Sequence, residues 1–174
     1  MKIKKKIIRL SKYVSLVVKT VFFKKKKIFH SFKQNDYVSI LAYTKNKKFL
    51  LVKQYRPAIE KFTLEIPGGL VDKREKPINA AKRELKEETG YYAKKIVHLG
   101  SFYVDVGRLE NKIHCYFAKN LIISKDFNKE PDLEIIEVNL YEFSNLIRQN
   151  KIIHFLHVGI VGLAKLKNLI NIKI

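Results

Sequence analysis

The sequence predicts an α+β fold or an α/β/α sandwich, and two observations lead to this prediction. Segments rich in β-branched and aromatic residues alternate with period two, as in YVSILAYT at residues 37–44. One helical segment is set among these strands and two more close the chain, a mixed order typical of such folds. With 174 residues, of which 47% are hydrophobic, the chain has about one domain's length and enough apolar side chains for a core.

The expected elements are separated mainly by glycines, prolines and polar clusters. Strands are predicted at residues 13–23, 27–32, 37–44, 49–55, 62–66, 96–103, 112–121 and 135–140. Helices are predicted at about 78–89, at 141–149 and at about 154–169. We expect residues 1–36 to form an N-terminal segment of basic strands and residues 37–174 to form the main domain.

The N-terminal segment superficially resembles a signal or membrane segment. Basic residues, including Lys5, Arg9 and Lys19, interrupt its apolar runs. No run reaches the roughly 20 residues that a spanning helix needs, and there is no small-residue cleavage site. We therefore expect basic strands and no transmembrane segment, with binding at a membrane interface as the alternative.

The charge and the cysteine content constrain partners and location. The chain carries 36 Lys and Arg against 16 Asp and Glu, a formal net charge of +20. Only six of these basic residues are arginine, whose planar fork recognises phosphates and bases, so no specific nucleic-acid partner is expected. The single cysteine, Cys115, lies in an alternating apolar segment and is expected to be buried. One thiol cannot form an internal disulfide, and we expect a cytoplasmic protein.

The helix predicted at about residues 78–89 has clear ends. Pro77 suits the first turn, where its missing N–H is not needed, and Gly90 suits the left-handed position after the last turn. At 100° per residue, Ile78, Ala81 and Leu85 form the face that packs on the core.

Glu84 and Glu88 lie one above the other beside this core face, and Glu87 lies a short way round the helix. Like charges at this spacing repel, and no arginine of the helix is placed to neutralise both. Arg83 precedes Glu87 by four residues and can pair with it. Mg²⁺ binds through one or two carboxylates together with substrate phosphates, so a metal would turn the repulsion into attraction. The alternative for an isolated pair of this kind is a solvated acidic helix face.

The neighbouring residues complete a longer pattern, G-x₅-E-x₇-R-E-U-x-E-E-x-G-U, in which U is apolar or aromatic. Its positions are Gly69, Glu75, Arg83, Glu84, Leu85, Glu87, Glu88, Gly90 and Tyr91. This pattern is identified as the Nudix box, and the chain resembles the Nudix hydrolase family. The resemblance implies a Nudix fold, an α/β/α sandwich around a mixed β-sheet, with the box as a loop–helix–loop and antiparallel strands at the N-terminus.

The resemblance also implies roles for the residues of the box. Glu84 and Glu88 would be the main ligands of Mg²⁺, with Mn²⁺ as a possible substitute, and Glu87 would bind metal or hold Arg83. The backbone carbonyl of Gly68 would complete the metal site. Arg83 and Glu75 would form an ion pair that fixes the loop against the helix, in which Gly69 and Gly90 are structural.

Three segments outside the box resemble the ADP-ribose pyrophosphatase branch of this family. In VKQYRPAIEKFTLEIPGG, at residues 52–69, Arg56 would touch the substrate and Glu65 would lie beside the metals. In FYVDVGRLENKIHCYFA, at residues 102–118, the residues that would approach the substrate are Gly107, Arg108 and Leu109. DLEIIEV, at residues 132–138, would supply a late catalytic glutamate, for which we expect Glu134, with Glu130 in reserve.

Each of these residues also has an ordinary structural interpretation. Arg56 could be a surface arginine, Glu65 could belong to the polar side of a strand, and Glu134 could lie in a plain acidic loop. The histidines show no metal-site spacing, and we expect all five to be structural: His30, His98, His114, His154 and His157.

The function implied by the resemblance is Mg²⁺-dependent hydrolysis of a nucleoside diphosphate sugar, with ADP-ribose cleaved to AMP and ribose 5-phosphate. The alternatives are another Nudix substrate, such as a different sugar nucleotide, a dinucleotide or an oxidised nucleotide, or a non-catalytic nucleotide- or RNA-binding module. Members of the branch are commonly homodimers in which an N-terminal aromatic residue of one chain stacks on the adenine bound by the other. This chain has no tryptophan, and the candidates are Tyr13, Phe22, Phe23, Phe29 and Phe32.

Overall fold

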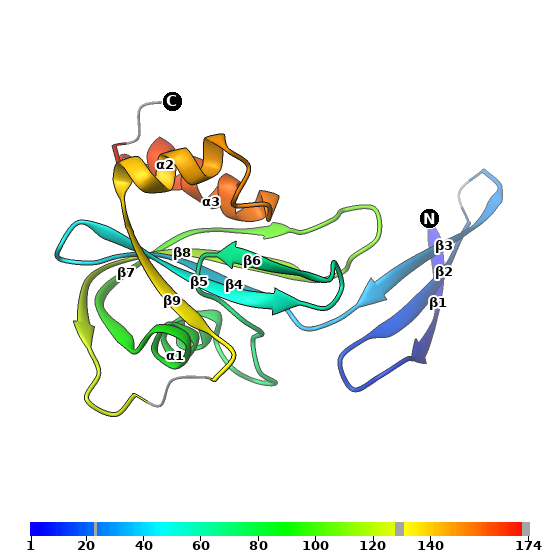
Figure 1. Ribbon diagram of the computed structural model, residues 1–174. Helices are drawn as coiled ribbons and strands as arrows, with labels where there is room; N and C mark the ends of the chain where they lie inside the picture. The colour runs from blue at the N-terminus through cyan, green and yellow to red at the C-terminus, as the bar shows by residue number, and fades with distance from the viewer. Residues whose placement is uncertain (23, 128–130, 172–174) are drawn as a thin grey trace.

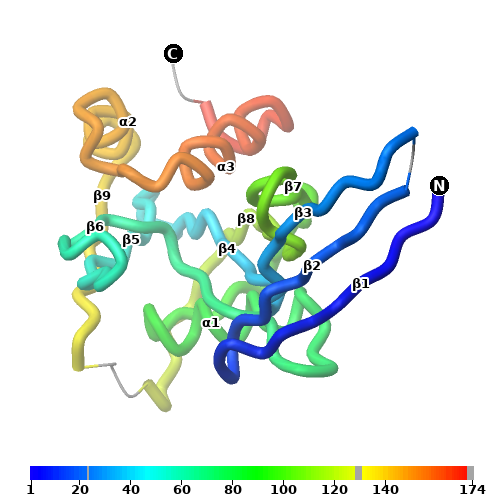
Figure 2. Tube along the Cα trace, turned by 90° about the vertical axis from the view of Figure 1, so that its right-hand side faces the viewer, coloured from blue at the N-terminus to red at the C-terminus, as the bar shows by residue number. Residues whose placement is uncertain are grey.

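The structure of the protein is a computed structural model that describes residues 1–22, 24–127 and 131–171. The described residues form a three-stranded sheet, a six-stranded sheet and three helices. Figure 1 shows the small N-terminal sheet (blue) projecting from one end of the main body, and in the turned view of Figure 2 this sheet faces the viewer, in front of part of the main body.

The N-terminal sheet is antiparallel and has the order β1-β2-β3. Its strands are β1 (Lys2–Arg9), β2 (Ser15–Phe22) and β3 (Lys26–Lys33). The predictions at residues 13–23 and 27–32 correspond to β2 and β3. The first strand was expected only as part of a basic N-terminus, because its lysines weaken the apolar signal of a strand.

The main sheet has the order β6-β5-β4-β8-β7, and β9 pairs with β5 outside this path. The parallel pairing of β4 with β8 makes the sheet mixed, as expected. The strands are β4 (Tyr37–Tyr43), β5 (Lys48–Arg56), β6 (Lys61–Glu65), β7 (Tyr91–Tyr103), β8 (Lys112–Ile123) and β9 (Glu134–Asn139). β7 begins at Tyr91, earlier than the predicted residue 96, because its first residues pair with the end of β8.

Helices cover both faces of the main sheet and give the expected three layers. Helix α1 (Pro77–Thr89) packs on one face, and α2 (Leu140–Arg148) and α3 (Phe155–Leu166) pack on the other (Figure 1). Each face has its own cluster of buried apolar residues, one containing Leu85 of α1 and the other containing Phe143 of α2. Cys115 is buried in the second cluster, as predicted, and burial raises the pKa of its thiol to about 12.

Strand β4 supports a loop that runs between β6 and α1. The N–H of Val38 donates to the carbonyl of Gly69 at 2.9 Å, and the N–H of Ile40 donates to the carbonyl of Pro67 at 2.8 Å. The loop is so close to β4 that a Cβ atom on Gly68 would overlap the carbonyl oxygen of Val38. Glycine is therefore required at residue 68 for this approach.

The N-terminal sheet is attached to the main body through the loop that joins β7 to β8. The N–H of Phe32 donates to the carbonyl of Arg108 at 2.7 Å, and the N–H of Glu110 donates to the carbonyl of Phe32 at 2.9 Å. The Glu110 carboxylate also accepts a hydrogen bond from Ser31 and pairs with Lys19. None of the helices in the described residues is both long enough and apolar enough to cross a membrane.

Candidate active site

Helix α1 presents its glutamates along one edge of its core face. It begins at Pro77 and ends at Thr89, and the next residue, Gly90, has a φ of +72° and donates its N–H to the carbonyl of Lys86. Ala81 and Leu85 are fully buried, whereas Lys82 is exposed. Because these residues fix how the helix is turned about its axis, they also fix the direction of Glu84, Glu87 and Glu88.

Arg83 donates hydrogen bonds to three of the nearby carboxylates at once. Its guanidinium donates to Glu75 at 2.9 and 3.2 Å, to Glu84 at 2.7 Å and to Glu87 at 3.0 Å. It also donates to the carbonyl of Leu70 at 2.9 Å, so it joins the loop to the helix. The expected pairs with Glu75 and Glu87 are present, whereas the contact with Glu84 was not expected. The hydrogen bonds from Arg83 lower the pKa of Glu75.

The loop and the remaining carboxylates are packed against each other. Glu88 is buried, and its Oε2 accepts a hydrogen bond from the N–H of Gly68 at 2.8 Å. A Cβ atom on Gly69 would overlap the carboxylate of Glu84. The two glycines therefore let the backbone of the loop pass directly beside Glu84 and Glu88.

These donors fit a hard divalent cation. Glu84, Glu87 and Glu88 offer carboxylate oxygens, the ligand type that such a cation prefers, and Glu84 and Glu88 lie against the loop. Among the described residues, no three acidic, histidine or cysteine side chains already converge closely enough to hold a metal ion by themselves. Mg²⁺ commonly binds through one or two carboxylates together with waters and substrate phosphates, so it does not require a closed set of protein ligands.

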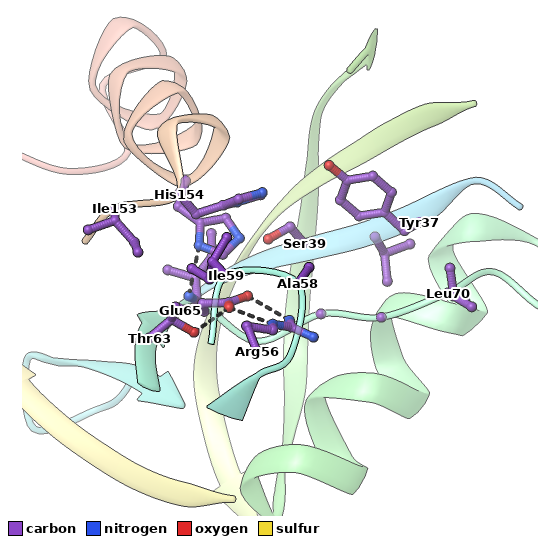
Figure 3. A pocket seen from close by; sticks show the side chains of 15 residues that line it. Tyr37, Ser39, Arg56, Ala58, Ile59, Thr63, Glu65, Leu70, Ile153 and His154 are labelled. Atoms are coloured by element: carbon purple, nitrogen blue, oxygen red, sulfur yellow. Dashed lines mark hydrogen bonds and ion pairs between the residues drawn. The ribbon is translucent and has the colours of Figure 1, made fainter. Parts of the chain in front are cut away.

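A cavity of about 570 Å³ lies beside this loop. It lies between β4, β6, the Gly68–Gly69 segment and the beginning of α3, and Figure 3 shows the side chains that line it. Arg56 and Glu65 face each other in its wall and form two hydrogen bonds, each of 2.7 Å. The structure thus brings these two predicted residues together beside the box.

Glu65 is a buried charge that is fully paired. It is 7% exposed, and Thr63 donates a further hydrogen bond to it at 2.6 Å. Burial would raise the pKa of Glu65, but the hydrogen bonds from Arg56 and Thr63 outweigh burial and lower this pKa to about 2. Glu65 is therefore ionised at neutral pH and gives Arg56 a fixed orientation.

This pairing predicts a pH dependence of stability. Because the pKa of Glu65 falls from an ordinary value of 4.5 to about 2 on folding, its contribution is complete above about pH 4.5 and is lost as the pH falls towards 2. We expect Glu65→Gln to lower the free energy of unfolding at pH 6 and to flatten its change between pH 4.5 and 2. Urea unfolding at several pH values measures both quantities. Parallel pH profiles for the variant and the wild type would contradict this prediction.

Two histidines complete the wall of the cavity, a position that the sequence analysis, which expected them to be structural, did not indicate. His154 and His157 line it from the beginning of α3, with ring centroids 4.2 Å apart. His157 is buried, and its Nδ1 accepts a hydrogen bond from the N–H of Ile66 at 3.3 Å. Burial lowers the pKa of both imidazoles, that of His157 to about 3. Only their three-residue separation could have indicated that they share a helix face.

Other predicted site residues lie outside the wall of this cavity. Glu134 begins β9, is exposed and pairs with Lys53 at 2.9 Å beside a different hollow. Arg108 is exposed and pairs with Asp105 at 2.7 Å. Gly107 belongs to the same turn, and Leu109 forms a bridge with Phe32. Their predicted roles remain predictions, and Glu130 and Phe23 lie outside the described residues.

Comparison with models of protein families establishes the family to which the chain belongs. The model of the NUDIX domain matches residues 33–156, which is most of the chain. The chain belongs to the Nudix family. This confirms the identification made from the box, and the helix with its glutamates is the Nudix helix.

Curated relatives support the predicted branch. The chain is 34% identical over 118 residues to an ADP-ribose pyrophosphatase of Bacillus subtilis, an alignment that covers 66% of this chain and 64% of the relative. It is 37% identical over 116 residues to an ADP-ribose pyrophosphatase of Saccharomyces cerevisiae, covering 61% of this chain and 50% of the relative. The chain thus aligns with less than two thirds of either relative's length.

A solved structure confirms the fold. The crystal structure of an ADP compounds hydrolase matches with a TM-score of 0.78 and covers 95% of this chain and 90% of that chain. Because the two sequences are 18% identical, this likeness establishes the Nudix fold and nothing about the substrate.

Proposed function

We propose that this protein hydrolyses the diphosphate bond of ADP-ribose and releases AMP and ribose 5-phosphate. One observation carries the proposal: the carboxylates of α1 lie against the Gly68–Gly69 loop, which also lines the cavity that contains Arg56 and Glu65. A divalent cation bound by these carboxylates would lie next to a cavity in which a fixed arginine can meet phosphate. Similarity to ADP-ribose pyrophosphatases supports ADP-ribose over other nucleoside diphosphate sugars.

Mg²⁺, or Mn²⁺ in its place, would be held by Glu84, Glu87, Glu88 and the carbonyl of Gly68. When bound, the metal supplies charge neutralisation for the diphosphate and lowers the pKa of a water molecule. The contact between Arg83 and Glu84 keeps the carboxylate in place before the metal arrives. The N–H of Gly68 does the same for Glu88.

Other residues of the chain orient the substrate and the attacking water. Arg56 is cationic and is fixed by two hydrogen bonds to Glu65, so it can bind a phosphate oxygen without first losing much side-chain freedom. For the carboxylate that would hold the water and accept its proton we keep Glu134, although its side chain pairs with Lys53 outside the wall of the cavity in this ligand-free structure. Gly107, Arg108 and Leu109 would contact the rest of the substrate.

The proposal extends to the oligomeric state of the protein and to its cellular location. We propose a cytoplasmic homodimer in which residues 1–36 form the dimerisation segment and supply the aromatic side chain that stacks on adenine. Apolar side chains are exposed on this small sheet, including Ile7, Ile28 and Phe29, and pairing with a second chain would cover them.

A substrate panel with product chromatography tests the proposed reaction. The panel contains ADP-ribose, other nucleoside diphosphate sugars, a dinucleotide and an oxidised nucleotide, each with Mg²⁺ and with EDTA. We expect ADP-ribose to give AMP and ribose 5-phosphate with Mg²⁺ and no products with EDTA. Cleavage of another compound while ADP-ribose survives would contradict the assigned substrate, and RNA binding without hydrolysis of any compound would contradict the assigned activity.

A further inference from the structure

The positive charge of the chain is concentrated in its N-terminal sheet. Residues 1–35 contain 12 lysines and arginines and no aspartate or glutamate, whereas the rest of the chain contains 24 basic and 16 acidic residues. A fifth of the chain thus supplies more than half of the formal net charge of +20. Such a concentration of like charge attracts anionic partners to this sheet.

Six of these basic residues gather at one end of the sheet, and all six are exposed. They are Lys2 and Lys4 of β1 and Lys24, Lys25, Lys26 and Lys27 at the turn into β3. The pairing of Lys2 with Phe22 and of Phe22 with Lys26 places the two groups side by side. We call residues 2–4, 22 and 24–27 the tip. Figure 1 shows that this end of the sheet points away from the main body, opposite to the attachment at Phe32.

The tip also exposes large apolar side chains. Ile3 of β1 and Phe22 at the end of β2 lie among the lysines and are both exposed. A surface that combines basic and large apolar residues suits the boundary of a lipid bilayer. There the positive charges meet anionic headgroups, and the apolar side chains reach the region of the acyl chains.

The composition of the tip favours a lipid surface over a nucleic acid. Arg9 is the only arginine in residues 1–35, and it lies outside the tip. The lysine ammonium is a point charge that lacks the planar fork with which arginine recognises phosphates and bases. Ile3 has no ring to stack on a base, whereas its aliphatic side chain gains free energy on leaving water for acyl chains.

We propose that the tip binds the surface of a bilayer that contains anionic lipids, with its lysines against the headgroups and Phe22 at the boundary with the acyl chains. This attachment goes beyond the proposed function and does not depend on it. Pairing with a second chain, as proposed above, would cover Ile7 and Phe29, which lie outside the tip. The same sheet can therefore serve both purposes.

Cosedimentation with vesicles measures the proposed binding. The vesicles contain phosphatidylcholine alone or phosphatidylcholine mixed with phosphatidylserine, and we expect the wild type to bind only the mixed vesicles. A tip variant carries Lys24→Gln, Lys25→Gln, Lys26→Gln and Lys27→Gln together. It should bind the mixed vesicles at least about a hundredfold more weakly, because each lysine near an anionic surface contributes roughly fivefold to the affinity.

A matched control separates the tip from the net charge of the chain. It carries four substitutions at exposed positions of the main body: Lys45→Gln, Lys82→Gln, Lys94→Gln and Lys95→Gln. The control loses the same charge as the tip variant. It should bind mixed vesicles within about threefold of the wild type, because salt screens charges that lie far from the membrane.

A fluorescence experiment tests the position of Phe22. Because the chain has no tryptophan, Phe22→Trp and Tyr141→Trp each introduce a single reporter, one in the tip and one exposed on α2. With mixed vesicles, the emission of Phe22→Trp should move to shorter wavelength as the indole leaves water, and that of Tyr141→Trp should stay the same. This measurement keeps all the lysines, so it does not depend on the folding of the tip variant.

Four results would overturn the proposal. The first is a wild type that does not bind mixed vesicles. The second is an equal loss of binding in the tip variant and the control, which would make net charge the cause. The third is an unchanged emission of Phe22→Trp on vesicles that carry the protein. The fourth is displacement of the protein from mixed vesicles by single-stranded RNA at equal phosphate concentration, which would indicate a nucleic-acid partner instead.

Discussion

Replacing Glu88 by glutamine is expected to abolish most metal-dependent turnover while the protein stays folded. The amide oxygen of glutamine can still accept the N–H of Gly68, which now bonds to Glu88 at 2.8 Å, so the loop keeps its support. The negative charge beside the loop is lost, however, and with it one proposed metal ligand. We expect kcat for ADP-ribose to fall by roughly 10³-fold, measured at saturating Mg²⁺, since metal stabilisation of a transition state amounts to several kcal/mol.

The control for this variant is Glu142→Gln, which makes the same chemical change on α2, far along the chain from the box. Its helix keeps a capping side chain at that position, because glutamine also suits the third residue of a helix. Wild-type kcat is expected for Glu142→Gln, and both variants should show wild-type thermal unfolding within a few degrees. A Glu88→Gln protein that retains wild-type turnover would exclude a metal role for Glu88.

Replacing Arg83 by leucine is expected to cause the largest loss of stability within the box. The change removes hydrogen bonds to Glu75, Glu84 and Glu87 together, and the remaining carboxylates then repel one another. Because the Arg83 side chain is 29% exposed, solvent screens part of this effect, and we expect a loss of about 2 kcal/mol. For a chain of this length that is a decrease in Tm of about 4–8 °C. Calorimetric unfolding measures the change.

Two further variants make this prediction specific to the geometry of Arg83. Lys82→Leu removes a neighbouring charge that faces solvent and should change Tm by less than about 2 °C. Arg83→Lys keeps the charge but cannot hold several carboxylates with a planar fork, so its stability should lie between those of the leucine variant and the wild type. If Arg83→Leu and Lys82→Leu lose equal stability, Arg83 does not organise the carboxylates.

Local signals predicted the helix of the box almost to the residue. Pro77 and Gly90 mark its ends through backbone geometry alone, and the apolar spacing of Ala81 and Leu85 fixes its buried face. The expected pair of Arg83 with Glu87 depends on the same spacing within the helix. These features could be predicted because each one depends only on residues that lie within a few positions of one another in the sequence.

Features that depend on distant residues could not be predicted in this way. His154 and Ser39 are separated by more than half the chain, and only the packing of α3 against the sheet places both on one cavity. The early start of β7 depends on its pairing with β8, because Lys94 and Lys95 break the apolar pattern of its first residues. Glu65 and Arg56 were found from their resemblance to a known branch, but their mutual pairing appears only in three dimensions.

The central claim is that Glu84 and Glu88 hold a divalent cation that binds a diphosphate. The most direct measurement is a titration of Mn²⁺ followed by electron paramagnetic resonance, in which bound Mn²⁺ loses the signal of the free ion. It uses the wild type and a Glu84→Gln, Glu88→Gln double variant, each with and without a methylene analogue of ADP-ribose that cannot be hydrolysed. We predict that the wild type takes up Mn²⁺ more tightly with the analogue present and that the double variant does not. Equal uptake by both proteins, or no uptake by the wild type with the analogue, would contradict the claim.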